Sequence, residues 1–146
     1  MLKRLELFRE GANKSFQVIT WFGGQTPFNR PEDLLEIQDM NFDGYRDLGI
    51  QYSRGGSAGQ RYYTFWLYDP RKRGFFLIEE LKSLCDPVRD VTKHRLTSTC
   101  KEGPDYYVTE TYTFKNGRLV AAELKETDLS GRELRGTRAG GDGGDE

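Results

Sequence analysis

Apolar and polar residues alternate in short stretches along most of the chain, and turn residues separate these stretches. This pattern is typical of β-strands. The clearest strand pair is Tyr106 to Lys115 and Arg118 to Leu124, because the intervening Asn116-Gly117 dipeptide favours a type I′ turn. We expect one face of the first strand to turn inward. Its residues are Tyr106, Val108, Glu110, Tyr112 and Phe114.

The same signals predict further strands, and helix signals are confined to one or two turns at 31–35 and 79–84. The strands expected outside the first hairpin are Arg4 to Arg9, Ser15 to Phe22, Arg61 to Tyr68, Phe75 to Leu81 and a short one near Glu133 to Arg135. Arg61 to Tyr68 is aromatic on both faces, so it is either covered on both faces or part of an exposed aromatic surface. The predicted fold class is all-β, with antiparallel sheets in a propeller-like or sandwich-like arrangement.

Length and charge limit the organisation and the partners of the chain. With 146 residues and 36% apolar content, we expect a single domain over residues 1–136, and a disordered Gly-rich and acidic tail over residues 137–146. The formal net charge of −1 disfavours a nucleic-acid partner. No apolar run approaches the roughly 20 residues of a membrane-spanning helix. The given chain shows no signal segment, so we expect any export signal to have been removed.

Two cysteines and a single histidine restrict metal and catalytic chemistry. A structural zinc site needs four ligands, whereas Cys85, Cys100 and His94 supply three. A hairpin with its turn midway between the cysteines would place them opposite one another, and the sequence leaves a disulfide and two free thiols both open. We expect His94 to lie exposed on a strand. Glu79 and Glu80 are expected to point to opposite faces of a strand, which disfavours an acid/base pair.

Oxygen-bearing side chains recur at alternate positions in Asp39-Met40-Asn41-Phe42-Asp43-Gly44-Tyr45-Arg46-Asp47. This D-x-N-x-D-G-x-x-D pattern matches the first nine positions of an EF-hand calcium loop. The twelfth position is Ile50 instead of a bidentate glutamate, so we expect an EF-hand-like Ca²⁺ loop between strands with a Kd of roughly 10⁻⁴ to 10⁻³ M. The alternative is a solvated turn whose side chains cap backbone donors. The predicted ligands are the side chains of Asp39, Asn41, Asp43 and Asp47 and the carbonyl of Tyr45.

Three motifs carry a resemblance to a known family. Asp-x-Asn-Phe-Asp-Gly-Tyr-x-Asp-Leu at 39–48 precedes a glycine-rich stretch, Tyr-x-Phe-Trp-Leu-Tyr-Asp at 63–69 and Phe-x-x-x-Glu-Leu-x-x-Leu at 76–84. Over residues 33–127 the sequence resembles bacterial immunity proteins that block lysozyme-like effectors of bacterium-killing type IV secretion systems. The resemblance implies an all-β, propeller-like fold, a periplasmic location and inhibition of a peptidoglycan hydrolase by plugging its cleft.

The glycine-rich stretch from Ser53 to Tyr62 is predicted to be the loop that contacts this hydrolase. Lysozyme-type clefts carry catalytic carboxylates, and hydroxyls, backbone donors and arginines would complement them. A flexible connection is the alternative. The predicted partner-binding residues are Arg54, Gly56, Ser57, Gly59, Arg61 and Tyr62.

Two other functions remain open. A calcium-stabilised carbohydrate-binding module would present exposed tryptophans and tyrosines, such as Trp21 and Trp66, on one flat face. A glycoside hydrolase would need two carboxylates about 5 to 10 Å apart in a cleft. We rank the inhibitor first and expect no enzyme activity.

Overall fold

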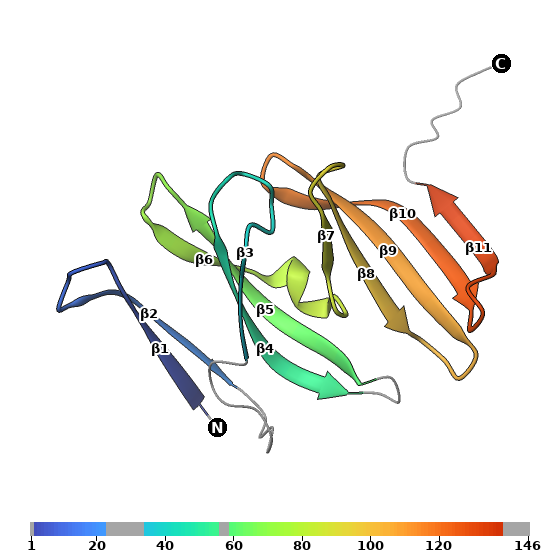
Figure 1. Cartoon of the computed structure of the whole chain (residues 1–146), viewed down its shortest axis with the longest axis horizontal. Coiled ribbons are helices and arrows are strands. Elements are labelled where there is room, and N and C mark those ends of the chain that lie inside the picture. The colour runs from blue at the N-terminus through green and yellow to red at the C-terminus, as the bar shows by residue number, and fades with distance from the viewer. Residues whose placement is uncertain (1, 23–33, 56–58, 139–146) are drawn as a thin grey trace.

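Residues 2–22, 34–55 and 59–138 are described by a computed structural model of the chain. They form strands β1 to β11 and a 3₁₀ helix, Glu79–Ser83 (Figure 1). The strands are β1 Leu2–Phe8, β2 Ser15–Phe22, β3 Leu35–Gln38, β4 Asp47–Gly55, β5 Gln60–Asp69, β6 Gly74–Ile78, β7 Val88–Asp90, β8 Arg95–Lys101, β9 Tyr106–Lys115, β10 Arg118–Asp128 and β11 Glu133–Arg138. The predicted all-β class is confirmed.

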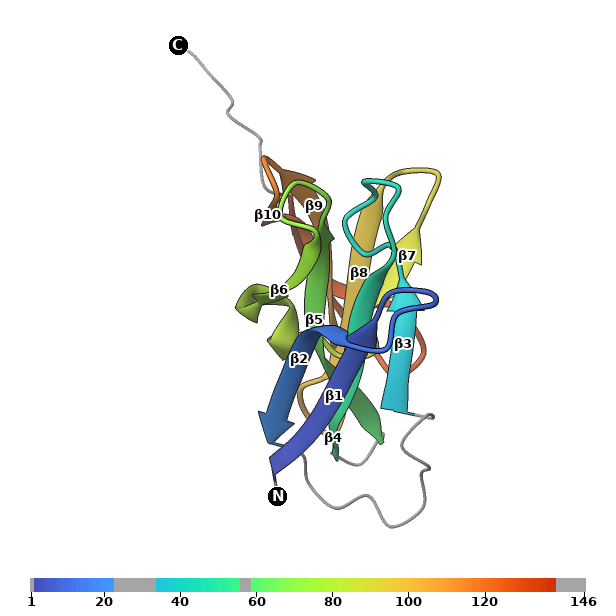
Figure 2. The ribbon, with the colours of Figure 1, turned by 90° about the vertical axis from the view of Figure 1, so that its left-hand side faces the viewer.

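The strands form three antiparallel sheets. The first is the β1–β2 hairpin, the second has the order β3-β4-β5-β6, and the third has the order β11-β10-β9-β8-β7. Figures 1 and 2 together show the hairpin, the four-stranded sheet and the five-stranded sheet as successive layers. The arrangement is therefore sandwich-like, with the β1–β2 hairpin on the outer face of the four-stranded sheet.

The four-stranded sheet is covered on both faces. Toward the five-stranded sheet, Tyr63, Phe65 and Leu67 of β5 belong to one core cluster. Toward the β1–β2 hairpin, Trp66 packs with buried Ile19 in a second cluster. This explains why the sequence of β5 is aromatic on both faces: each face meets a different apolar layer.

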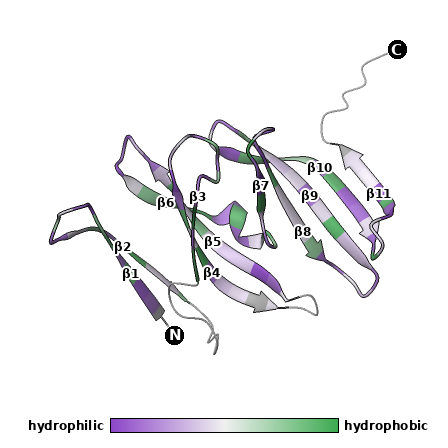
Figure 3. Cartoon of the chain, in the orientation of Figure 1, coloured by the Kyte–Doolittle hydropathy of each residue, from purple (hydrophilic) through white to green (hydrophobic). Residues whose placement is uncertain are grey.

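The predicted hairpin at Asn116-Gly117 is confirmed as β9 and β10. Asn116 and Gly117 have φ angles of 51° and 74°, as a type I′ turn requires. Tyr112 and Phe114 pack against the core cluster, which agrees with the inward face expected for β9. The turn between β5 and β6 is hydrophilic, as Figure 3 shows.

Some expected boundaries were wrong. The strand expected to reach Leu81 ends at Ile78. Glu79 and Glu80 lie on the 3₁₀ helix instead of a strand, which agrees with the helix signal at 79–84. The last strand continues to Arg138, two residues past the expected domain boundary. Residues 139–146 of the predicted tail, and most of the turn expected at 31–35, lie outside the described residues.

Cys85 and Cys100 form a disulfide with a Cα–Cα distance of 5.4 Å, which resolves the two possibilities left open by the sequence. The turn at residues 91–94 lies midway between them, as the hairpin geometry requires. His94 lies in this turn with a φ of 50°, instead of on a strand. Its ring stacks on Phe42, 5.2 Å between ring centroids.

Candidate functional site

The predicted calcium loop connects β3 to β4 and folds back on its own carboxylates. Asp39 accepts hydrogen bonds from the backbone N–H groups of Asp43 and Gly44, at 3.2 and 2.8 Å. Asp43 in turn accepts from Asn41 Nδ2 at 3.1 Å and from the Tyr45 N–H at 2.9 Å. Gly44 has a φ of 88°, so the glycine of the motif supplies the conformation that reverses the chain.

Asp47 is the buried member of the motif, with 1% of its surface exposed. Its Oδ2 accepts from the Met40 N–H at 2.7 Å and its Oδ1 from the Tyr68 N–H at 2.9 Å. Burial raises the pKa of Asp47 to about 6; the two backbone hydrogen bonds lower it, and the nearby Asp43 and Asp39 raise it. Asp47 therefore fastens the loop to β5.

The donor atoms of the loop partly fit a calcium ion. They are all oxygens, which calcium prefers. Asn41 Oδ1 is buried without a hydrogen-bond partner, so one buried oxygen is left for a cation. Across the described residues, however, no three His, Cys, Asp or Glu side chains gather into a group that could hold a metal ion. The carboxylate of Asp47 is directed to backbone donors, and its role as a ligand stays a prediction.

The expected contact loop from Ser53 to Tyr62 is wrong in extent. β4 continues to Gly55 and β5 begins at Gln60. Ser53 pairs with Tyr62, and Gly55 pairs with Gln60. The backbone of β5 offers hydrogen-bonding partners to this stretch, so it forms a strand despite its glycines. The stretch is the tip of the β4–β5 hairpin, and residues 56–58, which include the predicted Gly56 and Ser57, lie outside the described residues.

Arg61 and Tyr62 are held at the base of this tip. Arg61 forms an ion pair with Asp86, 2.8 Å between Nε and Oδ1, and this hydrogen bond raises the pKa of Arg61. The backbone of Asp86 also donates to the carbonyl of Arg61 at 2.9 Å. Tyr62 pairs with Cys85 in a single β-bridge. The base of the tip is therefore tied to the disulfide.

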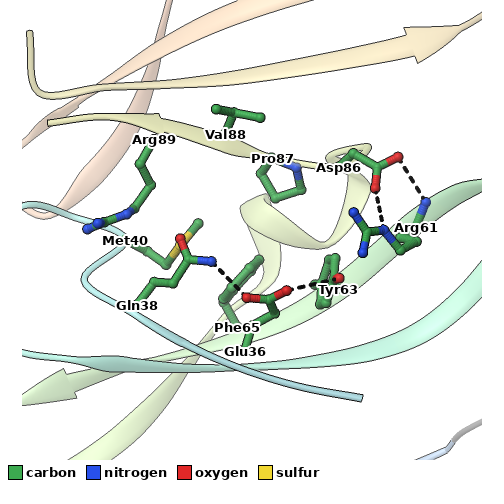
Figure 4. Close-up of a pocket in the computed structure, with 10 residues that line it drawn as sticks. All are labelled: Glu36, Gln38, Met40, Arg61, Tyr63, Phe65, Asp86, Pro87, Val88 and Arg89. Atoms are coloured by element: carbon green, nitrogen blue, oxygen red, sulfur yellow. Dashed lines mark hydrogen bonds and ion pairs between the residues drawn. The ribbon is translucent and has the colours of Figure 1, made fainter. Parts of the chain in front are cut away.

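A cavity of about 410 Å³ opens beside Arg61, between β3, β5 and the segment that leads into β7 (Figure 4). We call it the edge pocket. It is lined by Glu36, Gln38, Met40, Arg61, Tyr63, Phe65, Asp86, Pro87, Val88 and Arg89. No pattern in the sequence predicts this pocket, because its walls come from three segments that are brought together only by the fold.

The two tryptophans do not form an exposed platform. Trp66 is 7% exposed, and Trp21 is partly buried against the same core cluster. The observation that would have favoured a carbohydrate-binding module is thus missing for both residues.

Comparison with known proteins gives one similarity. The chain is similar to a solved structure described as a Xanthomonas type IV secretion system related protein, with 26% identity and a TM-score of 0.55. The match covers 65% of this chain and 47% of that chain, so it spans about half of the solved chain. No protein-family model and no curated protein matches the sequence. In the described part of the chain, no helix has the length and apolarity needed to cross a membrane.

Proposed function

We propose that this protein is an immunity-type inhibitor that binds and blocks a lysozyme-like peptidoglycan hydrolase and has no enzyme activity of its own. The observation that carries the proposal is the likeness to a type IV secretion related protein. It agrees with the family that the calcium-loop and aromatic-strand motifs resemble. Both the sequence and the fold thus support an association with type IV secretion, and the inhibitory role is the proposal.

The proposed contact surface is the tip of the β4–β5 hairpin, with Arg54, Gly56, Ser57, Gly59, Arg61 and Tyr62. Its base is braced by the Arg61–Asp86 ion pair and by the bridge between Tyr62 and Cys85. A contact segment on a rigid base loses less entropy on binding than a free loop. This bracing supports the hairpin tip as the element that enters the hydrolase cleft.

The proposed compartment is the periplasm. The Cys85–Cys100 disulfide supports it, because disulfides persist in oxidising compartments such as the periplasm and are rare in the cytosol. A peptidoglycan hydrolase would also act there.

The inhibitor proposal is tested by mixing the purified protein with lysozyme-like effectors of type IV secretion systems and following the turbidity of a peptidoglycan suspension. We expect lysis to stop near a one-to-one ratio. Ser57→Trp adds bulk in the glycine-rich stretch between β4 and β5 and should abolish inhibition with an unchanged melting temperature. Arg71→Trp, in the β5–β6 turn at the other end of β5, is the matched control and should inhibit normally. The proposal fails if no such hydrolase is blocked, or if Ser57→Trp blocks it as well as wild type.

We also propose that the loop at 39–47 binds Ca²⁺ through Asp39, Asn41, Asp43, the Tyr45 carbonyl and Asp47. The buried, unpartnered Asn41 Oδ1 supports this. The ion would neutralise the acidic loop and pin the connection between β3 and β4. With a Kd of roughly 10⁻⁴ to 10⁻³ M, 1 mM calcium should add roughly 0.4 to 1.4 kcal/mol to the free energy of unfolding.

Thermal melting with and without calcium tests this site. We expect wild type to melt higher in calcium and Asp43→Ala to show no response. Asp90→Ala is the control, since Asp90 caps a turn outside the loop by accepting from the Thr92 and Lys93 N–H groups. It should melt lower but keep the calcium response. If calcium raised the melting temperature of wild type and Asp43→Ala equally, the ion would bind outside this loop.

A further inference from the structure

The edge pocket lies between two strands that each end a sheet. β3 is the outermost strand of the four-stranded sheet, and β7 is the outermost strand of the five-stranded sheet. Within the described residues, each pairs with a neighbour on one side only. Such edges can accept an extended segment of another chain.

A carboxylate that forms no ion pair with another described residue lies in this pocket. The carboxylate of Glu36 accepts a hydrogen bond from the Tyr63 O–H at 3.3 Å and one from Gln38 Nε2 at 2.7 Å (Figure 4). Both donors are neutral, and in the described part of the chain no Lys or Arg forms an ion pair with Glu36. Glu36 is half-buried, so a cation placed against it would be attracted more strongly than in open solvent.

The two arginines of the pocket are already occupied. Arg61 is paired with Asp86. Arg89 donates from Nη1 to the Asp39 carbonyl at 2.6 Å and lies 6.0 Å from the centre of the Phe42 ring. Figure 4 shows the guanidinium of Arg89 directed away from Glu36. Arg61 attracts Glu36 only at longer range, and neither arginine forms an ion pair with it.

The remaining walls are apolar and partly aromatic. Phe65 and Met40 are buried beneath the pocket, whereas Val88 is 64% exposed at its rim. The rings of Tyr63 and Phe65 are 5.7 Å apart and tilted. Such walls suit a side chain with an aliphatic stem and a cationic head, which packs its stem on apolar surface and gains from nearby aromatic faces.

We propose that the edge pocket binds a basic side chain, arginine or lysine, presented by an extended segment of a partner protein that lies along the β3 and β7 edges. The head group pairs with Glu36, and the stem packs between Val88 and the Tyr63 ring. Arg61 belongs to both surfaces. This inference is still tested separately from the hydrolase proposal, because it is measured with peptides on the isolated protein, and Glu36 and Val88 lie outside the proposed hydrolase contact.

The test uses blocked pentapeptides that are identical except for a central arginine, lysine, citrulline or glutamate, titrated into the full-length ¹⁵N-labelled protein. The arginine and lysine peptides should shift the amide signals of β3, β7 and Tyr63 saturably. Citrulline has the shape of arginine without its charge, so its affinity should be about tenfold lower, the value of one charge-assisted hydrogen bond. The glutamate peptide should not bind.

Two variants complete the test. Glu36→Gln keeps a hydrogen-bond acceptor for Tyr63 and should lower the affinity for the arginine peptide about tenfold. Glu79→Gln makes the same charge change at an exposed residue outside the pocket and should bind normally. Should Glu36→Gln fold poorly, Val88→Trp, at the exposed rim, should block the peptide by filling the opening. Equal binding of the arginine and citrulline peptides, or shifts confined to other strands, would overturn the proposal.

Discussion

At the scale of single residues, Asp47 joins two elements through one carboxylate. Asp47→Asn keeps the shape of the side chain but removes one acceptor, which leaves the N–H of Met40 or Tyr68 without a partner in a buried site. We expect the free energy of unfolding to fall by about 1 to 3 kcal/mol in urea titrations. Asp90→Asn is the control: both of its hydrogen bonds are accepted by Oδ1 alone, which asparagine retains. Equal losses in the two variants would contradict this role.

Asp47 also shows how far spacing can be used to predict a site. Alternate oxygen donors and Gly44 predicted a calcium loop, with a turn that caps its own backbone donors as the alternative. The structure shows the capping hydrogen bonds of this alternative, which are local in sequence. The partner of Asp47 Oδ1 is the N–H of Tyr68, 21 residues away. No local pattern specifies this contact, so the sequence assigned Asp47 to the metal while the structure also gives it a role in folding.

At the scale of elements, the β1–β2 hairpin is attached to β6 by the side chain of Gln17. Gln17 Oε1 accepts from the Phe75 N–H at 2.8 Å, and Nε2 donates to the Phe75 carbonyl at 2.7 Å. The amide thus replaces a neighbouring strand at the β6 edge. Gln17→Ala should lower the free energy of unfolding by about 1 to 3 kcal/mol. It should also speed amide hydrogen exchange at Phe75 and in β1–β2, but not in β8–β9. Thr20→Ala, exposed on the same strand, should change neither measurement.

The hairpins were predictable where the turn itself carries the signal. Asn116-Gly117 specifies the turn conformation through two neighbouring residues. The extent of β4 and β5 was not predictable, because the glycines between them indicated a loop. Pairing between the two strands instead extends β4 to Gly55. The edge pocket was hidden for the same reason: it depends on which strands the fold brings together.

At the scale of the whole molecule, the chain stacks three layers, and the middle layer is apolar on both faces. This explains why one chain of 146 residues contains two core clusters. Within the larger cluster, Leu81 of the 3₁₀ helix and Leu84, the residue that follows the helix, pack with residues of both large sheets. Cys85 comes directly after Leu84. The disulfide then joins this segment, whose Cys85 pairs with Tyr62 of β5, to β8 of the five-stranded sheet.

Breaking this link should therefore destabilise the whole molecule. Closing a loop of this length, with a sequence separation of 15, adds about 3 kcal/mol by chain entropy. We expect the free energy of unfolding, measured by urea titration, to fall by about that amount when dithiothreitol reduces the disulfide. The Cys85→Ala/Cys100→Ala variant should match the reduced protein and be indifferent to the reductant. Because Tyr62 pairs with Cys85, inhibition of the proposed hydrolase should weaken in the same variant. Unchanged unfolding on reduction would show that packing alone holds the two sheets together.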